Sequence, residues 1–470
     1  MFEIGKRMLF KEALNTVSGL RYITEHCLRL RSSAGRRKLY EMPFMTEKGK
    51  LEEEYEKVGA LLACCQRRRA EGKGMPDFGL EQLKDIRRTL ERLEKGSVPD
   101  DIELYEIKHL VWLSEKVRAE AEAGNLGVVR LPVLSPVFGL LDPENTRIPR
   151  FYIYAAYLPE LGEVRKALQG EKNEERREEL RQQERRLEDR IRDRLALQLE
   201  EYAPALSDAL EQLANLDVWI AKAEFGFQWN LCRPCIGEEK TFYRGLFHPE
   251  VKAEVEGREQ LYQPVDVGIE RRATVITGAN MSGKSVLLKT LALAQSLAQF
   301  GFWLPAVEAR VVPVEEIWIG IGDEQDEKKG LSSYAAEMLH WNRLIRNVQE
   351  GKKMLALADE PARTTNPAEG RALVNAFADF LTEHQVLSMV TTHYGGLKAE
   401  CRRLRMRGFR EDKVTGKLTA ENINSYMDYS LEEDREEKVP QEALRIAEIL
   451  GVNSGLIENA EKYLKNDARK

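Results

Sequence analysis

One segment constrains the fold of this chain more than any other, because a strand-like run, a glycine-containing loop and a helix-forming stretch follow one another there. The β-branched run Thr274–Thr277 predicts a buried strand. Gly278-Ala-Asn-Met-Ser-Gly283-Lys284-Ser285 matches the pattern G-x-x-x-x-G-K-S/T, and helix-forming residues come directly after it. Strand, loop and helix in this order are the setting in which such a loop binds phosphate. The sequence therefore predicts an α/β domain of the P-loop NTPase class.

The residue types of this loop predict how a nucleotide is held. Glycines let backbone N–H groups converge on phosphate oxygens, and the N-terminus of the following helix adds positive potential. Lys284 is expected to reach the β- and γ-phosphates, and Ser285 is expected to bind Mg²⁺. ATP and Mg²⁺ are thus the expected cofactors. The predicted nucleotide-binding residues of this segment are Gly278, Asn280, Ser282, Gly283, Lys284, Ser285 and Val286.

Two further apolar runs end in residues that suit catalysis. Met354–Ala358 leads into Asp359 and Glu360, about 75 residues after the glycine loop. Asp359 is expected to hold Mg²⁺ through water, and Glu360 to position or activate the attacking water. The run Val386–Thr392 precedes His393, which is expected to sense the γ-phosphate. The predicted catalytic residues are Glu360, His393 and Lys284, and the predicted metal ligands are Ser285 and Asp359.

The composition of the chain limits which partners and which cellular compartment are expected. Charged residues make up 32% of the 470 residues and the net charge is −6, which argues against a dedicated nucleic-acid-coating protein but leaves room for a local basic face. No run of about 18 apolar residues and no secretory signal is present, so no membrane partner is expected. The six cysteines are scattered, with Cys232 and Cys235 forming the one C-x-x-C, and this usage favours incidental thiols in a reducing cytoplasm.

Three regions that differ in composition and residue pattern precede the α/β domain. Residues 1–125 carry apolar residues at three- and four-residue spacing, which predicts helices. Residues 126–160 are rich in proline and predict a connector with extended pieces rather than a helix. Residues 161–240 predict a long charged helical arm and a return helix. We interpret the arm as a solvated helix with one packing seam; the alternative is an arm that grips a partner, with DNA as a candidate for its arginines. The seam consists of Leu180, Leu187, Ile191, Leu195 and Leu199.

Four motifs, in this order, resemble one family. TGANMSGKS, GLSSYAAEM, LADEPARTTNPAEG and TTHY look like the MutS ATPases of the ABC-related class. SSAGRRKLYEMPFMT is similar to the start of the MutS helical lever, and ALRIAEILGVNSGLIENAEKYL is similar to the family's C-terminal dimer element. The resemblance implies an α/β P-loop NTPase domain of the ABC type at residues 241–430, C-terminal to an all-α lever domain. It further implies that residues 1–125 form the lever and core region and residues 431–470 a helical dimerisation element.

The resemblance also implies composite sites in a dimer, either a homodimer or a heterodimer with a sister MutS-like chain. Two ATPase domains of this class pair head to tail, and the signature loop of one completes the site of the other. Carried over, Ser332 and Ser333 would touch the γ-phosphate in the partner, and Asn366 would lie in the loop that crosses the interface. Asp323 and Gln325 fall where the family has the loop linking the two sites.

Tyr262 and two departures from the family pattern leave questions open. Tyr262 precedes the P-loop strand and either stacks on adenine or belongs to the core. The family usually follows Asp-Glu with Gly-Arg-Gly-Thr, whereas this chain has Pro361-Ala362-Arg363-Thr364, so the geometry of this loop is in question. Mismatch-reading members also carry an N-terminal domain with a Phe-x-Glu wedge and a connector domain. This chain opens in lever-like sequence, so mismatch reading by this chain alone is not expected.

Two functions follow from the resemblance. The first is a MutS-like ATPase that hydrolyses ATP to ADP and phosphate and acts as a clamp on duplex or branched DNA, related to mismatch repair. The alternative is an ATP-dependent reactivating factor for a cobalamin-dependent aminomutase such as lysine 5,6-aminomutase, with the aminomutase as its protein client. In both, hydrolysis would change the conformation of a dimer and lever helices would transmit the change.

Overall fold

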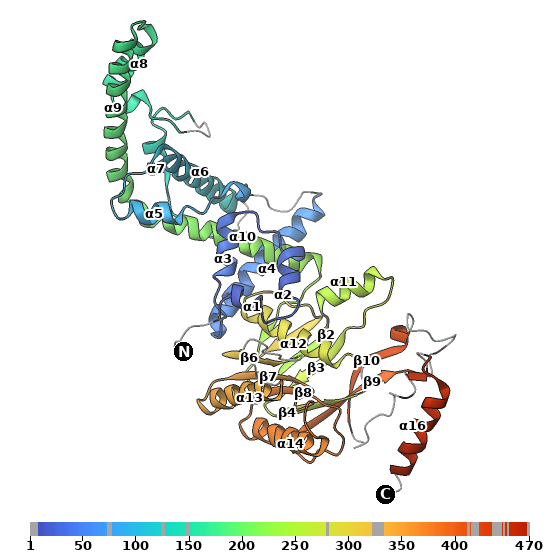
Figure 1. The fold of residues 1–470 in the computed structure, drawn as a ribbon. Helices are drawn as coiled ribbons and strands as arrows, with labels where there is room; N and C mark the ends of the chain where they lie inside the picture. The colour runs from blue at the N-terminus through green and yellow to red at the C-terminus, as the bar shows by residue number, and fades with distance from the viewer. Residues whose placement is uncertain are drawn as a thin grey trace. The chain divides into compact units, whose positions relative to one another are not determined.

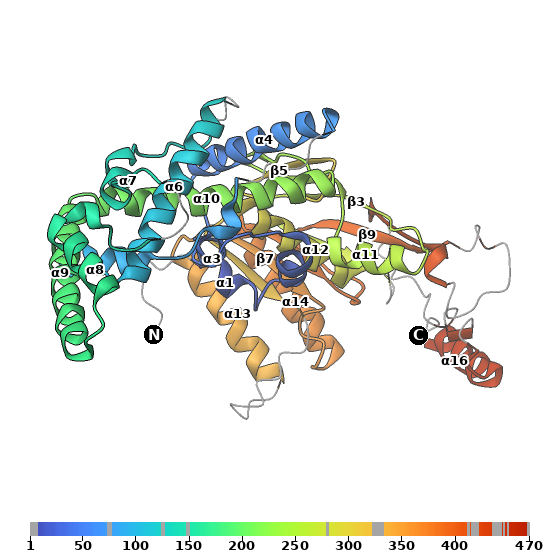
Figure 2. The same ribbon diagram turned by 90° about the horizontal axis from the view of Figure 1, so that it is seen from above.

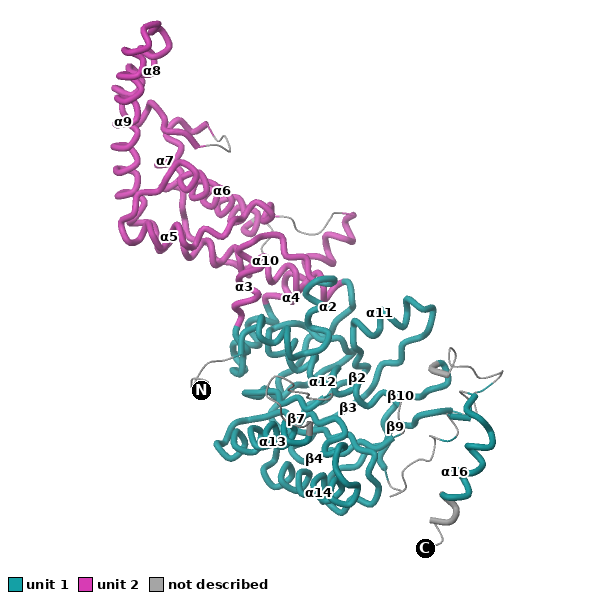
Figure 3. The backbone as a smooth tube through the Cα atoms, viewed as in Figure 1, with its two compact units in different colours: residues 1–27, 43–56, 228–470 teal, residues 28–42, 57–227 magenta. Residues whose placement is uncertain are grey.

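The computed structural model divides the chain into two compact units, which interleave along the sequence. Unit 1 contains residues 1–27, 43–56 and 228–470, and unit 2 contains residues 28–42 and 57–227 (Figure 3). Within these units the structure describes residues 8–72, 78–123, 127–146, 151–278, 282–321, 333–410, 414, 423–434, 444, 447–448 and 451–467. No helix in this part of the chain combines the length and the apolar character that crossing a membrane requires.

A six-stranded sheet forms the centre of unit 1. In spatial order its strands are β10 (Met427–Glu433), β9 (Arg402–Phe409), β4 (Ala273–Thr277), β8 (Leu387–Thr391), β7 (Met354–Asp359) and β6 (Glu316–Gly320). All neighbouring pairs are parallel except β10 with β9. Strands β4, β7 and β8 are buried along nearly their whole length, as expected for parallel strands with both faces covered. The predicted α/β domain is therefore confirmed.

Helices cover both faces of this sheet. Helix α12 (Lys284–Gln299) lies on one face, whereas α13 (Ser333–Gln349) and α14 (Pro367–Glu383) lie on the other (Figure 1). On the second face Trp341 of α13 stacks on Phe377 of α14, with ring centroids 4.4 Å apart. Strands β4, β8, β7 and β6 are parallel, so the loops that follow them lie at the same carboxyl edge of the sheet. Ligands of open α/β sheets bind at this edge.

A smaller sheet and short helices complete unit 1. Phe10 of α1 packs edge-on against Phe300, which follows α12, with ring centroids 5.1 Å apart. The N-terminal segment is therefore part of the core of unit 1. The small sheet has the order β1 (Cys235–Ile236), β5 (Glu308–Val311), β2 (Thr241–Leu246) and β3 (Val265–Ile269). The helices are α1 (Phe10–Ala13), α2 (Leu20–Tyr22), the π-helix η1 (Ile23–Cys27), α11 (Pro249–Gly257), the 3₁₀-helix η6 (Ile423–Tyr426) and α16 (Ser454–Asp467).

The described residues of unit 2 form helices and connecting segments. Helix α4 lies along α10, with the Lys57 ammonium over the ring of Trp219 and the Arg69 guanidinium over Phe227 (Figure 2). Together these contacts join segments about 160 residues apart in sequence. The elements are α3 (Ser33–Tyr40), α4 (Lys48–Ala70, which enters unit 2 at residue 57), η2 (Leu80–Gln82), α5 (Arg87–Leu93), α6 (Asp101–Ala123), α7 (Ser135–Leu141), η3 (Ala155–Tyr157), α8 (Pro159–Gly170), α9 (Glu174–Glu200) and α10 (Ala203–Gln228).

The structure agrees with the predicted apolar stripe of the arm but not with the prediction of a connector without helices. The apolar stripe of α9 is buried at all five positions expected, and Arg165 of α8 bonds Glu184 and Glu188 on its charged side. The expectation that residues 126–160 contain no helix is wrong, because α7 lies within them. Pro136 falls in the first turn of α7, where its missing N–H breaks no helical hydrogen bond. The roles of these regions as lever and arm stay a prediction.

A buried carboxylate fixes the start of α3 against α10. Asp217 is fully buried and accepts hydrogen bonds from the backbone N–H groups of Arg31 (3.0 Å) and Ser32 (2.8 Å) and from the Ser32 hydroxyl (2.6 Å). Gly35 permits this approach, since a Cβ at that position would overlap the Asp217 carboxylate. Because three donors depend on one side chain, the contact orders the chain before α3 as well as the helix.

Asp217→Ala should therefore destabilise unit 2 strongly. Removing the acceptor leaves buried donors of Arg31 and Ser32 without a partner, and we expect a loss of about 3–5 kcal/mol in the free energy of unfolding. Urea unfolding followed by circular dichroism measures it. Asp208→Ala on the exposed side of the same helix is the matched control. A loss below about 1 kcal/mol for Asp217→Ala would contradict this account.

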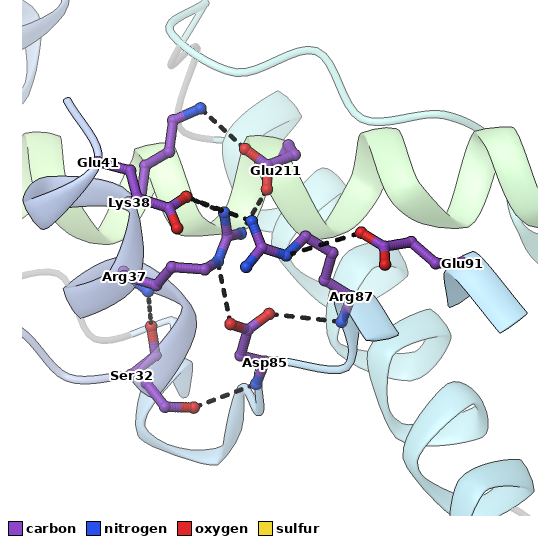
Figure 4. Close-up of polar contacts among 10 residues, drawn as sticks. Ser32, Arg37, Lys38, Glu41, Asp85, Arg87, Glu91 and Glu211 are labelled. Atoms are coloured by element: carbon purple, nitrogen blue, oxygen red, sulfur yellow. Dashed lines mark hydrogen bonds and ion pairs between the residues drawn. The ribbon is translucent and has the colours of Figure 1, made fainter. Parts of the chain in front are cut away.

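A second polar network joins α3, the start of α5 and α10 (Figure 4). The half-buried guanidinium of Arg37 lies between Glu211 and Asp85, 3.0 Å from the latter. Lys38 adds a second bond to Glu211 at 2.8 Å, and Arg87 lies 3.3 Å from Glu41, the C-cap residue of α3. Partly exposed ion pairs contribute little stability, so the network mainly fixes the direction of these helices relative to one another.

Candidate nucleotide-binding and catalytic site

The carboxyl edge of the large sheet opens into a cavity of about 1150 Å³ within unit 1. Its walls come from the start of α12, the end of β7, helix α11, the segment before β3 and strand β10. This volume slightly exceeds the range of about 300–1,000 Å³ usual for ligand pockets. The sequence-predicted residues that line the cavity are Tyr262, Ser282, Gly283, Lys284, Ser285, Val286, Asp359 and Glu360.

The glycine loop has the backbone geometry that its sequence predicts. Gly278 and Gly283 have φ values of +153° and +90°, which L-residues avoid. Gly283 occupies the N-cap position of α12, and a Cβ there would lie 2.8 Å from Cδ1 of Tyr429. Glycine is thus required at this position by both conformation and space. Asn280, between the two glycines, lies outside the described residues.

Lys284 points from the first turn of α12 toward the loop and the sheet edge. Its buried Nζ donates to the Gly278 carbonyl at 2.8 Å and lies 3.7 Å from Glu360 Oε1. Burial lowers the pKa of Lys284, and the carboxylates of Glu360 and Asp359 oppose that shift. Within the described part of the chain, the buried Ser282 hydroxyl has no hydrogen-bond partner. A phosphate group would satisfy such a hydroxyl and accept from the lysine, so this end of the cavity fits a nucleotide.

The end of β7 presents two carboxylates that differ in their surroundings. Asp359 Oδ1 accepts a hydrogen bond from the Thr391 hydroxyl at 2.5 Å, because β7 and β8 are in register there. The Glu360 N–H is held by the same threonine, at 3.0 Å from its hydroxyl oxygen and 3.2 Å from its carbonyl. Asp359 and Ser285 fit Mg²⁺, which proteins bind through one or two carboxylates together with the substrate's phosphates. No group of three or more His, Cys, Asp or Glu side chains among the described residues is arranged so that it could hold a metal ion by itself.

His393 completes the group of charged side chains at this edge. Its Nδ1 lies 3.8 Å from Glu360 Oε2, and its ring is partly exposed. Parallel strands β4, β8 and β7 are neighbours, so the loops that follow them meet at one place. The structure therefore brings Lys284, Glu360 and His393 together, as the sequence predicted, although His393 itself does not line the cavity.

The turn that follows Asp359 has left-handed backbone geometry although it contains no glycine. Glu360 and Ala362 have φ values of +47° and +57°, in the left-handed region that glycine favours. Each costs roughly 1–2 kcal/mol for a residue with a Cβ. The chain thus adopts left-handed geometry here without glycine, and the surrounding structure must stabilise it.

The remaining predicted residues are placed as follows. Tyr262 lines the cavity, and its hydroxyl oxygen accepts a hydrogen bond from the His248 N–H at 3.0 Å. Asn366 lies outside the cavity lining and caps α14 by accepting from the Ala368 N–H at 2.9 Å. Ser333 is the first residue of α13. Ser332, Asp323 and Gln325 lie outside the described residues.

Sequence reasoning missed several lining residues, of which Tyr429 lies against the glycine loop. The register of β10 with β9 shifts between Asp428 and Leu431, so the direction of Tyr429 depends on an irregularity that periodicity does not reveal. Gln263 accepts from the Tyr429 N–H at 3.1 Å and donates to Asp428 at 2.9 Å. An adenine-sized ring could thus meet two tyrosines. Other missed lining residues are Trp318, Glu337, His340, Arg363 and Met406.

Comparisons with known proteins agree with this geometry. The family model for MutS domain V matches residues 274–466, from strand β4 to the C-terminal helix α16. An endonuclease MutS2 from Pediococcus pentosaceus is 30% identical over 332 residues, which cover 70% of this chain and 40% of that protein. The chain belongs to the MutS family. The MutS2 of Thermus thermophilus is 34% identical over 255 residues, or 53% of this chain and 33% of that protein.

A second group of MutS relatives matches a shorter part of the chain. The DNA mismatch repair protein MutS of Thermus aquaticus is 34% identical over 197 residues, which cover 42% of this chain and 23% of that protein. The chain spans two fifths or less of the length of these curated relatives. The likeness therefore establishes the family of this chain, but it does not by itself assign to this chain the activity of the full-length relatives.

Proposed function

We propose that this chain binds ATP with Mg²⁺ in the unit 1 cavity, hydrolyses it, and uses the cycle to change the conformation of a dimer. The observation that carries this proposal is the convergence of Lys284, Asp359, Glu360 and His393 beside the glycine loop at one edge of a parallel sheet. Membership of the MutS family supports it.

Each side chain has a distinct task in this proposal. Backbone N–H groups of the glycine loop and the Lys284 ammonium hold the β- and γ-phosphates. Ser285 and Asp359 would hold Mg²⁺, which would neutralise charge on the phosphates. Glu360 accepts a proton from the attacking water, and its N–H bonds to Thr391 fix its backbone. His393, 3.8 Å from Glu360, orients that carboxylate or the γ-phosphate.

Dimerisation completes the site in this proposal. Ser332, Ser333 and Asn366 would then act across the interface, and the lever-like helices of unit 2 would transmit the change. Tyr262 and Tyr429 would contact the adenine ring from the cavity walls.

For the client, we favour DNA, because relatives of this chain carry the names endonuclease MutS2 and DNA mismatch repair protein MutS. Several arginines of α9 are paired with acidic neighbours, such as Arg176 with Glu179 at 2.6 Å and Arg192 with Asp189 at 2.7 Å. Such a helix offers a mixed surface rather than an open basic face, so we expect weak DNA binding that depends on salt.

ATPase rates with and without DNA test this function. The purified protein is assayed alone, with duplex DNA and with branched DNA, at about 50 and 200 mM salt. Stimulation by DNA that fades as salt rises is the expected result, because phosphate contacts release counterions. A rate indifferent to every DNA would contradict the DNA client and favour a protein client, for which a cobalamin-dependent aminomutase would be added next. No hydrolysis under any condition would contradict the ATPase assignment.

A further inference from the structure

The turn that carries Glu360 is held by side chains from two other segments. Glu360 and Ala362 both have left-handed backbone conformations, and Pro361 between them has a fixed φ. Backbone of this kind persists only where the surrounding structure determines it. The direction of the Glu360 carboxylate therefore depends on whatever holds the Ala362 peptide groups.

Three hydrogen bonds hold those groups: a local one from the Thr365 N–H to the Ala362 carbonyl at 3.4 Å, and two from side chains of other segments. The Ala362 N–H donates to Glu337 Oε1 at 2.7 Å, and the Ala362 carbonyl accepts from the Tyr394 hydroxyl at 3.0 Å. Ala362 is fully buried, so water does not replace a lost partner. Gly370 of α14 gives Tyr394 its room, since a Cβ there would overlap the tyrosine hydroxyl. The negative charge of Glu337 strengthens the bond that it accepts.

Glu337 also connects this turn to the start of α13. It lies four residues after Ser333, the first residue of that helix, and therefore about one helical turn along it. A helix is nearly rigid over such a distance, so a shift at its N-terminus would move the Glu337 carboxylate. Through Ala362 the shift would reach Glu360, two residues earlier in the chain.

We propose that Glu337 is a positioning residue that sets the direction of the Glu360 carboxylate and couples it to the start of α13, with Tyr394 as the second holder of the same turn. The inference rests on the proposed function, in which Glu360 activates water. Glu337 also lines the cavity, but it acts on Glu360 through the Ala362 backbone, so its loss should lower kcat much more than it weakens ATP binding.

Three variants of the full chain test the coupling. Glu337→Ala removes the acceptor for the Ala362 N–H, and we expect kcat to fall about 10-fold or more while Kd for ATP changes less than about threefold. Glu337→Gln keeps an oxygen that can accept the same bond, so kcat should stay within about fivefold of wild type. Arg346→Ala, at an exposed position of the same helix, is the matched control and should match wild type.

Hydrogen exchange of the nucleotide-free proteins tests the contact independently of turnover. Amides of residues 359–364 should exchange faster in Glu337→Ala and at the wild-type rate in Glu337→Gln. Equal exchange in all proteins, an unchanged kcat in Glu337→Ala, or a parallel loss of ATP binding and kcat would each overturn the inference. A wild type without hydrolysis would instead contradict the proposed function, and exchange would still decide whether Glu337 holds the turn.

Discussion

Glu360→Gln is expected to abolish most ATP turnover while leaving ATP bound. Glutamine keeps the size of the side chain and leaves the N–H bonds to Thr391 in place, but its amide does not accept a proton from water at neutral pH. Loss of a general base typically costs about 10² to 10⁴ in rate, so kcat should fall at least about 100-fold. Single-turnover phosphate release measures the chemical step, and a filter-binding assay with labelled ATP measures retention.

The amide also removes a charge beside Lys284 and His393. Glu360 lies 3.7 Å from the first and 3.8 Å from the second, so its neutralisation removes a negative charge from beside the proposed position of the phosphates. ATP should therefore dissociate more slowly from Glu360→Gln than from wild type, because ground-state binding is retained or strengthened. Glu383→Gln, the same change at the exposed end of α14, should match wild type in both assays. Normal hydrolysis by Glu360→Gln would show that another residue activates the water.

The catalytic residues that the sequence predicted share one physical property: each lies beyond the end of a buried parallel strand, Glu360 and His393 close to that end and Lys284 after the glycine loop. Thr274–Thr277, Met354–Ala358 and Val386–Thr392 are too apolar to lie elsewhere, and parallel strands deliver their carboxyl ends to one edge. Local order along the chain was therefore enough to bring Lys284 close to Glu360.

Other parts of the site depend on contacts that no local pattern encodes. Tyr429 faces the glycine loop because β10 slips in register, and Ala362 adopts its left-handed conformation among contacts from distant segments. The helical period predicted α9 and its seam but gave no sign that residues near Phe10 belong to unit 1. That assignment depends on aromatic packing against Phe300, about 290 residues away in sequence.

Lys284→Ala should prevent nucleotide binding at concentrations that saturate the wild type. The ammonium is buried, so its contact with phosphate would be made largely away from water. Truncating one partner of such a charge pair costs about 2–5 kcal/mol, and we expect Kd for ATP to rise at least about 30-fold. Fluorescence of a labelled ATP analogue measures Kd, and hydrolysis should fall in parallel because the site stays empty.

The thermal stability of Lys284→Ala shows whether its loss of ATP binding results from the missing ammonium or from unfolding of the protein. Burial lowers the pKa of Lys284, which means that the folded protein holds the charged form at a cost in free energy. Removing the ammonium removes that cost but also the bond to the Gly278 carbonyl, so Tm of the nucleotide-free variant should stay close to that of wild type. Lys289→Ala, at an exposed position of the same helix, should change neither Kd nor Tm. If Lys284→Ala bound ATP with wild-type affinity, the cavity would have to hold phosphate through the loop backbone alone, and the role assigned to the lysine would be wrong.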